Sequence, residues 1–242
     1  MKKLFAKAFL GLCALGTSTV AFAQEAAIDS GMHQALKTKF IEGGADFMSL
    51  VAITLVLGLA FCLERIIYLN LADVNPDRLL KGIEDALESG DIEGAKSIAR
   101  DTRGPIASIA YQGLMRIDKG IDVVEKSIVS YGGVQGGLLE KNLSWVSLFI
   151  AMAPSLGFLG TVVGMIMAFD KIEQVGDISP TVVAGGMKVA LITTVGGLIV
   201  ALILQVFYNY LLSKLEGILN KMEDASITLI DMVIKYDLKF KN

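Results

Sequence analysis

Three apolar runs, each long enough to cross a lipid bilayer as a helix, dominate this chain of 242 residues. They cover residues 47–70, 143–169 and 187–212, and about 20 helical residues cross the roughly 30 Å of hydrocarbon in a membrane. Hydrophobic residues make up 53% of the chain, and its mean hydropathy is +0.59, which exceeds that of ordinary soluble domains. The runs therefore predict an all-α membrane protein with three transmembrane helices and long cytoplasmic helical extensions.

Residues 1–23 have the pattern of a secretory signal peptide that is cleaved. Three lysines occur within the first seven residues, an apolar core follows at residues 8–20, and Ala21-Phe22-Ala23 is a small-x-small cleavage site. The mature chain is then expected to begin at Gln24. The alternative is an uncleaved anchor.

The distribution of lysine and arginine sets the orientation of the spans. Residues 71–142 and the tail at 213–242 are rich in basic residues, whereas residues 170–186 contain only Lys171. Loops rich in lysine and arginine stay in the cytoplasm. We therefore expect a cytoplasmic helical domain at 71–142 and a cytoplasmic helical tail at 213–242, with a periplasmic loop at 170–186.

The segment 24–46 is expected on the periplasmic side, as a cleaved signal peptide also requires. Met32, Leu36 and Phe40 recur there at a four-residue step, which indicates a short amphipathic helix that can lie on a membrane surface.

Local signals predict several helices between residues 71 and 142. Asn75-Pro76 starts the first and Ser89-Gly90 ends it, Asp91 caps the second, and Arg103-Gly104-Pro105 precedes the third. A fourth begins near Ile121, and the glycine pairs at 132–133 and 136–137 predict a kink or a close helix contact.

Several functional classes have no support in the composition. The net charge is −3 and no basic patch is present, which excludes a nucleic-acid surface. Cys13 and Cys62 are the only cysteines and His33 is the only histidine, so no disulfide framework or metal set is expected. Serine, aspartate and lysine residues are scattered, and we predict neither an enzyme nor a cofactor.

Threonines lie at matching depths in the second and third spans. Thr161 precedes Phe169 by eight residues, about 12 Å of helix, and Thr194 follows Met187 by seven, about 10 Å. In antiparallel helices these hydroxyls lie at similar depth in the outer half of the bilayer. Either they line a shared polar route together with Thr193, or they bond to carbonyls one turn earlier and simply pack.

Small residues accompany these threonines and predict close helix packing. They are Gly157, Gly160, Gly164, Gly196, Gly197 and Ala201.

Ionisable residues occur only near the ends of these spans. Asp170 and Lys188 are expected at the outer mouth, where one option is an ion pair between them, and Glu64-Arg65 marks the inner end of the first span. A proton path through a membrane normally uses a titratable carboxylate. Neither of the two later spans contains Asp, Glu or His at mid-depth, so a partner would have to bring the acid.

The second and third spans also carry two recognisable motifs. Residues 153–165 read Ala-Pro-Ser-Leu-Gly-Phe-Leu-Gly-Thr-Val-Val-Gly-Met, and residues 190–201 read Ala-Leu-Ile-Thr-Thr-Val-Gly-Gly-Leu-Ile-Val-Ala, with Phe207-Tyr208-Asn209-Tyr210 downstream. They resemble the Leu-Gly-Leu-Leu-Gly-Thr-Val-x-Gly and Ala-Leu-x-x-Thr-Ala-x-Gly-Leu signatures of the MotA/TolQ/ExbB proton-channel family, and most closely its ExbB/TolQ branch. The resemblance covers residues 45–235.

The resemblance implies a homo-oligomer, a pentamer, in the lipid of the bacterial inner membrane. Its second and third spans would line a pore that holds a dimer of ExbD- or TolR-like single-span subunits. The partner's intramembrane aspartate would carry the proton near Thr161 and Thr194, and a TonB-like protein would receive the energy.

The chain departs from the family pattern at two places. Many ExbB and TolQ relatives have a glutamate five residues before the third-span threonine, where this chain has Val189. Their Ala-Ile-Pro-Ala stretch is Ala201-Leu202-Ile203-Leu204 here, without the proline.

The functional hypothesis is a proton-channel stator or motor subunit that couples proton-motive force to a TonB-type system for active outer-membrane transport. The alternatives are a Tol-like envelope motor, a gliding or secretion motor, and a non-conducting scaffold around a partner helix.

Overall fold

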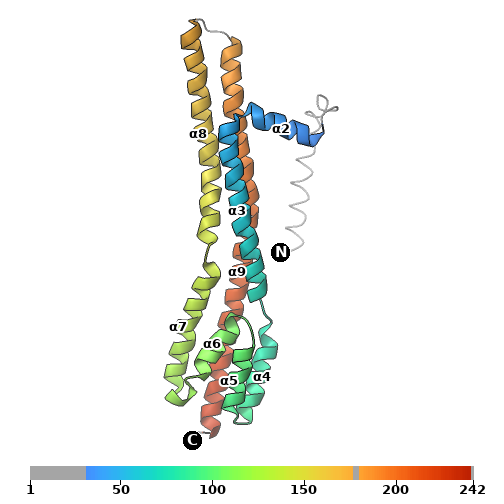
Figure 1. Cartoon of the computed structure of the whole chain (residues 1–242). Helices are drawn as coiled ribbons and strands as arrows, with labels where there is room; N and C mark the ends of the chain where they lie inside the picture. The colour runs from blue at the N-terminus through green and yellow to red at the C-terminus, as the bar shows by residue number, and fades with distance from the viewer. Residues whose placement is uncertain (1–30, 177–179, 241–242) are drawn as a thin grey trace, which may run out of the picture. The chain divides into compact units, whose positions relative to one another are not determined.

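The computed structural model describes residues 31–176 and 180–240, and within these ranges the regular structure is entirely helical (Figure 1). The helices in chain order are α2 (Met32–Glu42), α3 (Ala45–Ala72), α4 (Pro76–Glu88), α5 (Ile92–Asp101), α6 (Pro105–Leu114), the 3-10 turn η2 (Ile117–Lys119), α7 (Ile121–Glu140), α8 (Leu143–Val175) and α9 (Pro180–Phe240). Three helical stretches are long and apolar enough to cross a membrane. They are Ala45–Glu88, which contains α3, Ile121–Val175, which contains α8, and Pro180–Phe240, which is α9. The predicted all-α membrane fold is confirmed, whereas the predicted signal peptide at 1–23 lies outside the described residues.

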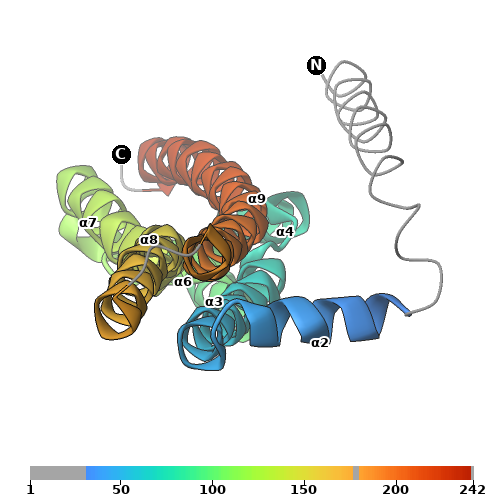
Figure 2. The ribbon, with the colours of Figure 1, turned by 90° about the horizontal axis from the view of Figure 1, so that it is seen from above.

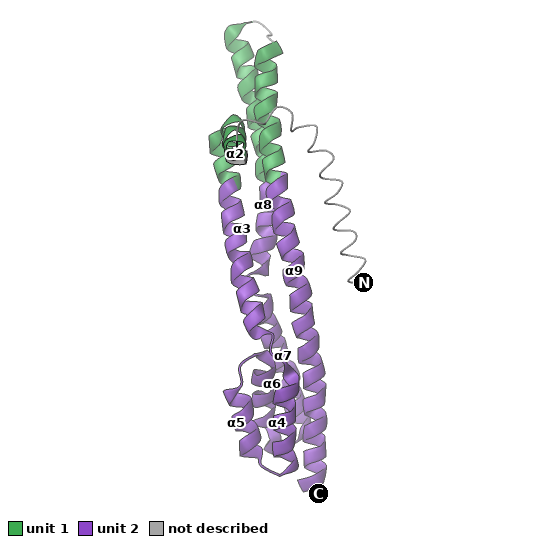
Figure 3. Cartoon of the chain, turned by 90° about the vertical axis from the view of Figure 1, so that its right-hand side faces the viewer, with its two compact units in different colours: residues 1–51, 155–197 green, residues 52–154, 198–242 purple. Residues whose placement is uncertain are grey.

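The chain divides into two compact units (Figure 3). The first, here called the seam unit, consists of residues 1–51 and 155–197, and the second, here called the bundle unit, consists of residues 52–154 and 198–242. Both units contain part of α3, α8 and α9. In the seam unit, α2 runs sideways from the start of α3 (Figure 2).

The capping signals in the sequence place the short helices of the bundle unit. The Asn75 side chain accepts a hydrogen bond from the backbone nitrogen of Asp77 at 3.0 Å, and Pro76 occupies the first turn of α4. The Asp91 side chain accepts from the nitrogen of Gly94 at 2.8 Å and starts α5. Gly104, with φ of +115°, turns the chain before Pro105 starts α6. All three predicted helix starts are confirmed.

Apolar faces of α4 to α7 and of the end of α9 form the core of the bundle unit. Its fully buried side chains include Ile83, Ile109, Leu114, Ile128 and Leu229. A Cβ atom on Gly113 of α6 would lie 2.8 Å from Ile128 of α7 and 3.6 Å from Leu229 of α9, so the three helices meet at this glycine. Asp73, just after α3, forms ion pairs with both Lys214 and Lys221 of α9.

The break between α7 and α8 lies at Lys141 and Asn142, not at the glycine pairs. The pairs at 132–133 and 136–137 lie inside α7, and a Cβ atom on Gly133 or Gly137 would meet nothing within 4 Å. The alternative expectation, a helix contact, fits Gly132 and Gly136, whose Cβ atoms would lie 4.0 Å from Ile109 and 3.5 Å from Leu219. The helix breaks later, where Asn142 adopts a left-handed φ of +67°. Asparagine tolerates this conformation better than most residues.

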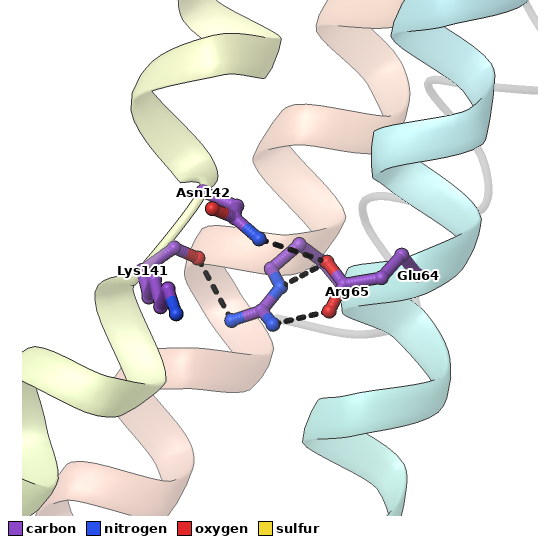
Figure 4. Close-up of polar contacts among 4 residues, drawn as sticks. All are labelled: Glu64, Arg65, Lys141 and Asn142. Atoms are coloured by element: carbon purple, nitrogen blue, oxygen red, sulfur yellow. Dashed lines mark hydrogen bonds and ion pairs between the residues drawn. The ribbon is translucent and has the colours of Figure 1, made fainter.

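The Arg65 side chain of α3 forms hydrogen bonds at the break between α7 and α8 (Figure 4). Its Nη1 donates to the carbonyl oxygen of Lys141 at 2.8 Å, and its Nε donates to Glu64 Oε2 at 2.6 Å. Asn142 Nδ2 lies 3.5 Å from the same Glu64 oxygen. The Arg65 side chain is only 3% exposed, whereas that of Glu64 is 46% exposed. The sequence placed this pair at the end of a span but did not show that it closes a helix joint.

The two long helices extend past the apolar runs from which they were predicted. α8 continues to Val175 through Asp170 and Lys171, and α9 begins at Pro180. Hydropathy marks where a helix leaves the hydrocarbon, but polar residues continue a helix readily in water. α9 then runs unbroken to Phe240, as expected from the absence of proline at 201–204.

Candidate functional site

Glycines on α8 allow its backbone to approach that of α9 within the seam unit. A Cβ atom on Gly157 would lie 3.0 Å from the carbonyl oxygen of Thr193 and 3.1 Å from the Cα of Thr194. A Cβ atom on Gly164 would lie 3.3 Å from that of Ala190. The contact is thus made by backbone atoms, and any side chain at these glycines would separate the helices.

The other small residues are divided between different neighbours. Gly160 packs on the side chain of Thr193, and Gly196 faces Met48 of α3 at 3.2 Å. Gly197 is buried, and Ala201 is half-buried in the bundle unit. The sequence analysis missed Gly186, which packs directly on Ala168. The four-residue step from Gly164 to Ala168 was the signal for it.

Thr161 and Thr194 meet across the α8–α9 contact. Their hydroxyl oxygens are hydrogen-bonded to each other. Each also lies near the carbonyls of Gly157 and Ala190: both reach Gly157 O at 3.2 Å and Ala190 O at 3.3 Å. The hydroxyls thus face one another and also reach carbonyls one turn earlier, as the packing alternative requires. The shared polar route stays a prediction.

This threonine pair is only half-buried in the single chain. Two hydroxyls supply two protons and share several acceptors, so either hydroxyl can turn to another partner without leaving the other unsatisfied. The pair is suited to hydrogen-bond a group that approaches from outside the chain.

Thr193 differs from the pair in its surroundings. Its side chain is 1% exposed and donates to the carbonyl oxygen of Ala190 at 2.7 Å. It packs against Gly160 and lines a cavity between the start of α3, α8 and α9. Thr193 is therefore next to the pair in sequence and faces a different space.

Lys188 forms its ion pair with Glu42, not with Asp170. Lys188 Nζ lies 2.8 Å from Glu42 Oε1, and Lys39 Nζ lies 2.9 Å from Glu42 Oε2. Both Asp170 and Lys171 are exposed on α8. The hydrogen bond from Lys188, followed by that from Lys39, lowers the pKa of the Glu42 carboxyl below its ordinary value. The suggested Asp170–Lys188 pair is thus replaced, because α2 brings a nearer carboxylate.

Among the described residues, no group of three or more His, Cys, Asp or Glu is placed to hold a metal ion. Among the described residues of the seam unit, the contacts above bring together hydroxyls, backbone carbonyls and the ion-paired Glu42 carboxylate.

Comparison with known proteins points to one family. A model of the MotA/TolQ/ExbB proton channel family matches residues 101–224. An ExbB homolog of Methanothermobacter thermautotrophicus, described as a biopolymer transport protein, is 27% identical over 187 residues, which are 76% of this chain and 66% of the relative. Biopolymer transport protein exbB1 of Vibrio cholerae is 33% identical over 109 residues, 38% of this chain and 48% of the relative. An ExbB-like biopolymer transport protein of Synechocystis is 26% identical over 182 residues, 74% of this chain and 71% of the relative.

The chain spans about two thirds of the length of the first relative and about half that of the second. The family match covers more than half of this chain and includes both threonine-bearing segments. Together with three apolar helices and a glycine-lined α8–α9 contact, it shows that the chain belongs to the MotA/TolQ/ExbB proton channel family and is ExbB-like.

Proposed function

We propose that this protein is the channel subunit of a proton-driven motor that energises a TonB-type system for active transport across the outer membrane. It would lie in the bacterial inner membrane with a periplasmic mature N-terminus and a cytoplasmic C-terminus. Its second and third spans would line the pore of a homo-pentamer.

The observation that carries this proposal is the Thr161–Thr194 pair, which lies between two apolar helices that contain no acid at mid-depth. A partner with one span and one intramembrane aspartate would supply the missing carboxylate, as ExbD- or TolR-like subunits do in the family that the chain resembles. Threonine hydroxyls can donate to a carboxylate and accept from a carboxylic acid. The pair can therefore stabilise both protonation states of the partner's acid.

The mature N-terminal segment and the Glu42–Lys188 ion pair would lie on the periplasmic side, with Asp170 and Lys188 near the outer mouth of the pore. The segments at 71–142 and 213–242, which are rich in lysine and arginine, would face the cytoplasm.

Valine substitutions test the role of the threonine pair, because valine has nearly the shape of threonine but lacks the hydroxyl. We expect Thr161→Val and Thr194→Val each to lower TonB-dependent uptake by about 100-fold. Thr161→Ser and Thr194→Ser, which keep the hydroxyl, should retain most activity. Uptake of a labelled siderophore in cells that lack the native protein provides the measurement.

Co-purification of the partner with each variant provides the control for assembly. Normal uptake in both valine variants would contradict the proposal. Loss of uptake together with loss of the complex would assign the threonines to packing, and so would also count against it.

One observation favours a second candidate, a non-conducting scaffold around a partner helix. The Thr161, Thr193 and Thr194 hydroxyls all reach backbone carbonyls of their own chain. Packing alone therefore satisfies them. A scaffold predicts that the valine variants keep both the complex and its activity, and that activity does not respond to a protonophore.

A further inference from the structure

The helices α7 and α9 contact each other in the bundle unit and run in opposite directions. A Cβ atom on Gly113 would lie 2.8 Å from Ile128 of α7 and 3.6 Å from Leu229 of α9, so these two residues lie at one level. Eight residues later on α7, a Cβ atom on Gly136 would lie 3.5 Å from Leu219, which is ten residues earlier on α9. The two contacts fix the heights of other residues on both helices, because each helical residue adds about 1.5 Å.

Exposed apolar side chains lie at one height on the two helices, outside this contact. Val129 of α7 is 65% exposed, and Ile227 of α9 is 56% exposed. Val129 directly follows Ile128, and Ile227 lies two residues before Leu229. Because the helices are antiparallel, the two exposed side chains differ in height by only about 2 Å.

Charges of opposite sign also lie at matching heights on the two helices. Counted from the level of Gly113, Lys126 lies two residues away on α7 and Asp231 two residues away on α9, about 3 Å in the same direction. Asp122 and Lys235 lie six residues away, about 9 Å in that direction. All four charged side chains are exposed, and in the described part of the chain none of them takes part in a salt bridge.

The α7 face is also hollowed at this place. The hollow is open and is lined by Asp122, Glu125, Lys126, Val129 and Ser130. It therefore contains the α7 half of both the apolar and the charged pattern, and it can receive an apolar side chain such as that of Ile227.

A second copy of this chain has the complement of each face. Copies that share one orientation in a membrane are related by rotation about an axis along the membrane normal, and such a rotation keeps every residue at its height. Residues that match in height within one chain therefore also match between neighbouring copies. A contact between two different faces repeats from copy to copy and can close into a ring.

We propose that the exposed face of α7 in one copy packs on the exposed face of α9 in the next copy. The matched residues are Val129 with Ile227, Lys126 with Asp231, and Asp122 with Lys235. Exposed ion pairs add little to affinity, so the apolar contact supplies the attraction and the charges fix the register. The existence of this contact rests on the homo-oligomer of the proposed function, whereas its residues and register come from the geometry of one chain.

Disulfide cross-linking in native membranes tests the contact. In a background with Cys13→Ala and Cys62→Ala, one chain has Val129→Cys and a second, tagged chain has Ile227→Cys, and both are expressed together. Leu238→Cys in place of Ile227→Cys is the matched control, because Leu238 is 64% exposed on the same helix but lies eleven residues further, about 16 Å away. With copper phenanthroline as the oxidant, we expect about tenfold more cross-linked dimer than in the control, because a disulfide forms only between closely placed Cβ atoms.

The same cysteines distinguish a head-to-tail ring from a two-fold contact. With both cysteines in one chain, we expect a ladder of cross-linked multimers that ends in a closed ring. Dimers formed by either single-cysteine chain with itself would show that one face meets its own copy, and would overturn the inference. Equal yields with the Leu238→Cys control, or no dimer at all, would overturn it as well.

Charge reversal tests the register. Lys126→Asp places a second acid opposite Asp231, and Asp231→Lys places a second base opposite Lys126. We expect each substitution alone to lower the yield of cross-linked dimer about fivefold, and the two together to restore it. Arg100→Asp, on α5, is the control and should leave the yield unchanged. A double reversal that stays as low as the single ones would contradict the register.

These measurements do not depend on proton flux. If the valine variants of the threonine pair were active while the cross-linked dimer still formed, the proposed function would fail and the α7–α9 contact would stand. If no dimer formed while the valine variants lost uptake, the contact would be overturned and the proposed function would stand.

Discussion

Gly157 has no Cβ atom, and this allows the backbones of α8 and α9 to lie in contact. Its Cβ position would lie 3.0 Å from the carbonyl oxygen of Thr193, and backbone atoms cannot move aside as a flexible side chain can. We therefore expect Gly157→Ala to lower the free energy of unfolding by about 1–3 kcal/mol. Denaturant titration of the purified protein in detergent provides the measurement.

Gly133→Ala is the matched control, because this helical glycine has nothing within 4 Å of its Cβ position. Alanine there should raise the stability by about 0.5–1 kcal/mol, since it lowers the entropy of the unfolded chain. Equal effects of the two substitutions would contradict the role assigned to Gly157.

The Glu42–Lys188 ion pair is expected to depend on pH in a fixed direction. The folded-state pKa of Glu42 lies below its ordinary value, because Lys188 and then Lys39 donate to its carboxylate. A lowered carboxyl pKa gives stability that is present above the unfolded-state pKa and lost as the pH falls through the folded-state pKa. The tie between α2 and α9 should therefore persist at neutral pH and weaken only in acid, below the usual carboxyl range.

Hydrogen exchange of residues 39–46 as a function of pH checks this prediction. Glu42→Gln should show the acid behaviour of the wild-type protein already at neutral pH. A protection factor, corrected for the intrinsic pH dependence of amide exchange, that falls as the pH rises from neutral would have the wrong sign and would contradict the assignment.

At the scale of elements, the joint between α7 and α8 depends on a residue from α3. Arg65 is 3% exposed and satisfies the carbonyl of Lys141, next to the left-handed Asn142. Arg65→Met keeps the length of the side chain but leaves this carbonyl without its donor. We expect a loss of about 1–3 kcal/mol in stability and faster hydrogen exchange at residues 138–145.

Arg100→Met provides the comparison, because Arg100 is 64% exposed and forms its ion pair with Asp101, which is also exposed. Such surface pairs contribute between about 0 and 1 kcal/mol. If both substitutions had the same small effect, the joint would not depend on Arg65.

The elements that the sequence predicted well are those whose signals are local. The caps at Asn75 and Asp91 and the Gly104-Pro105 turn act on backbone groups within a few residues, so the sequence alone specifies them. The joint at 141–142 could not be predicted in the same way, because Arg65 is 76 residues away from Lys141. The glycine pairs lower the helix propensity of α7, but packing against neighbouring helices can still keep the segment helical.

The candidate site shows the same limit. Helical periodicity and the depth of each span were sufficient to bring Thr161 and Thr194 to the same level, and they are hydrogen-bonded. The suggested pairing of Lys188 with Asp170 was wrong, because Lys188 pairs with Glu42. Glu42 lies at the end of α2, just before the turn at Gly43 and Gly44, and helical periodicity does not predict such a turn. The separate surroundings of Thr193 depend on the three-dimensional fold, since adjacent helical residues point about 100° apart.

At the scale of the whole molecule, one chain provides hydroxyls and close-packed helices but no acid within the two later spans. Under the proposed function, proton coupling would require a second protein, and the pore would be complete only in the assembly. We expect native mass spectrometry of the complex purified with its partner to give five copies of this chain and two of the partner. A mass that corresponds to this chain alone would contradict the assembly.

Proton flux into liposomes that contain the purified complex tests the central claim most directly. With a membrane potential imposed, we predict a protonophore-independent flux in the wild-type complex, and a loss of about 100-fold in Thr161→Val and Thr194→Val at unchanged stoichiometry. Equal flux in the wild-type and valine complexes would contradict the claim that these hydroxyls serve the proton path.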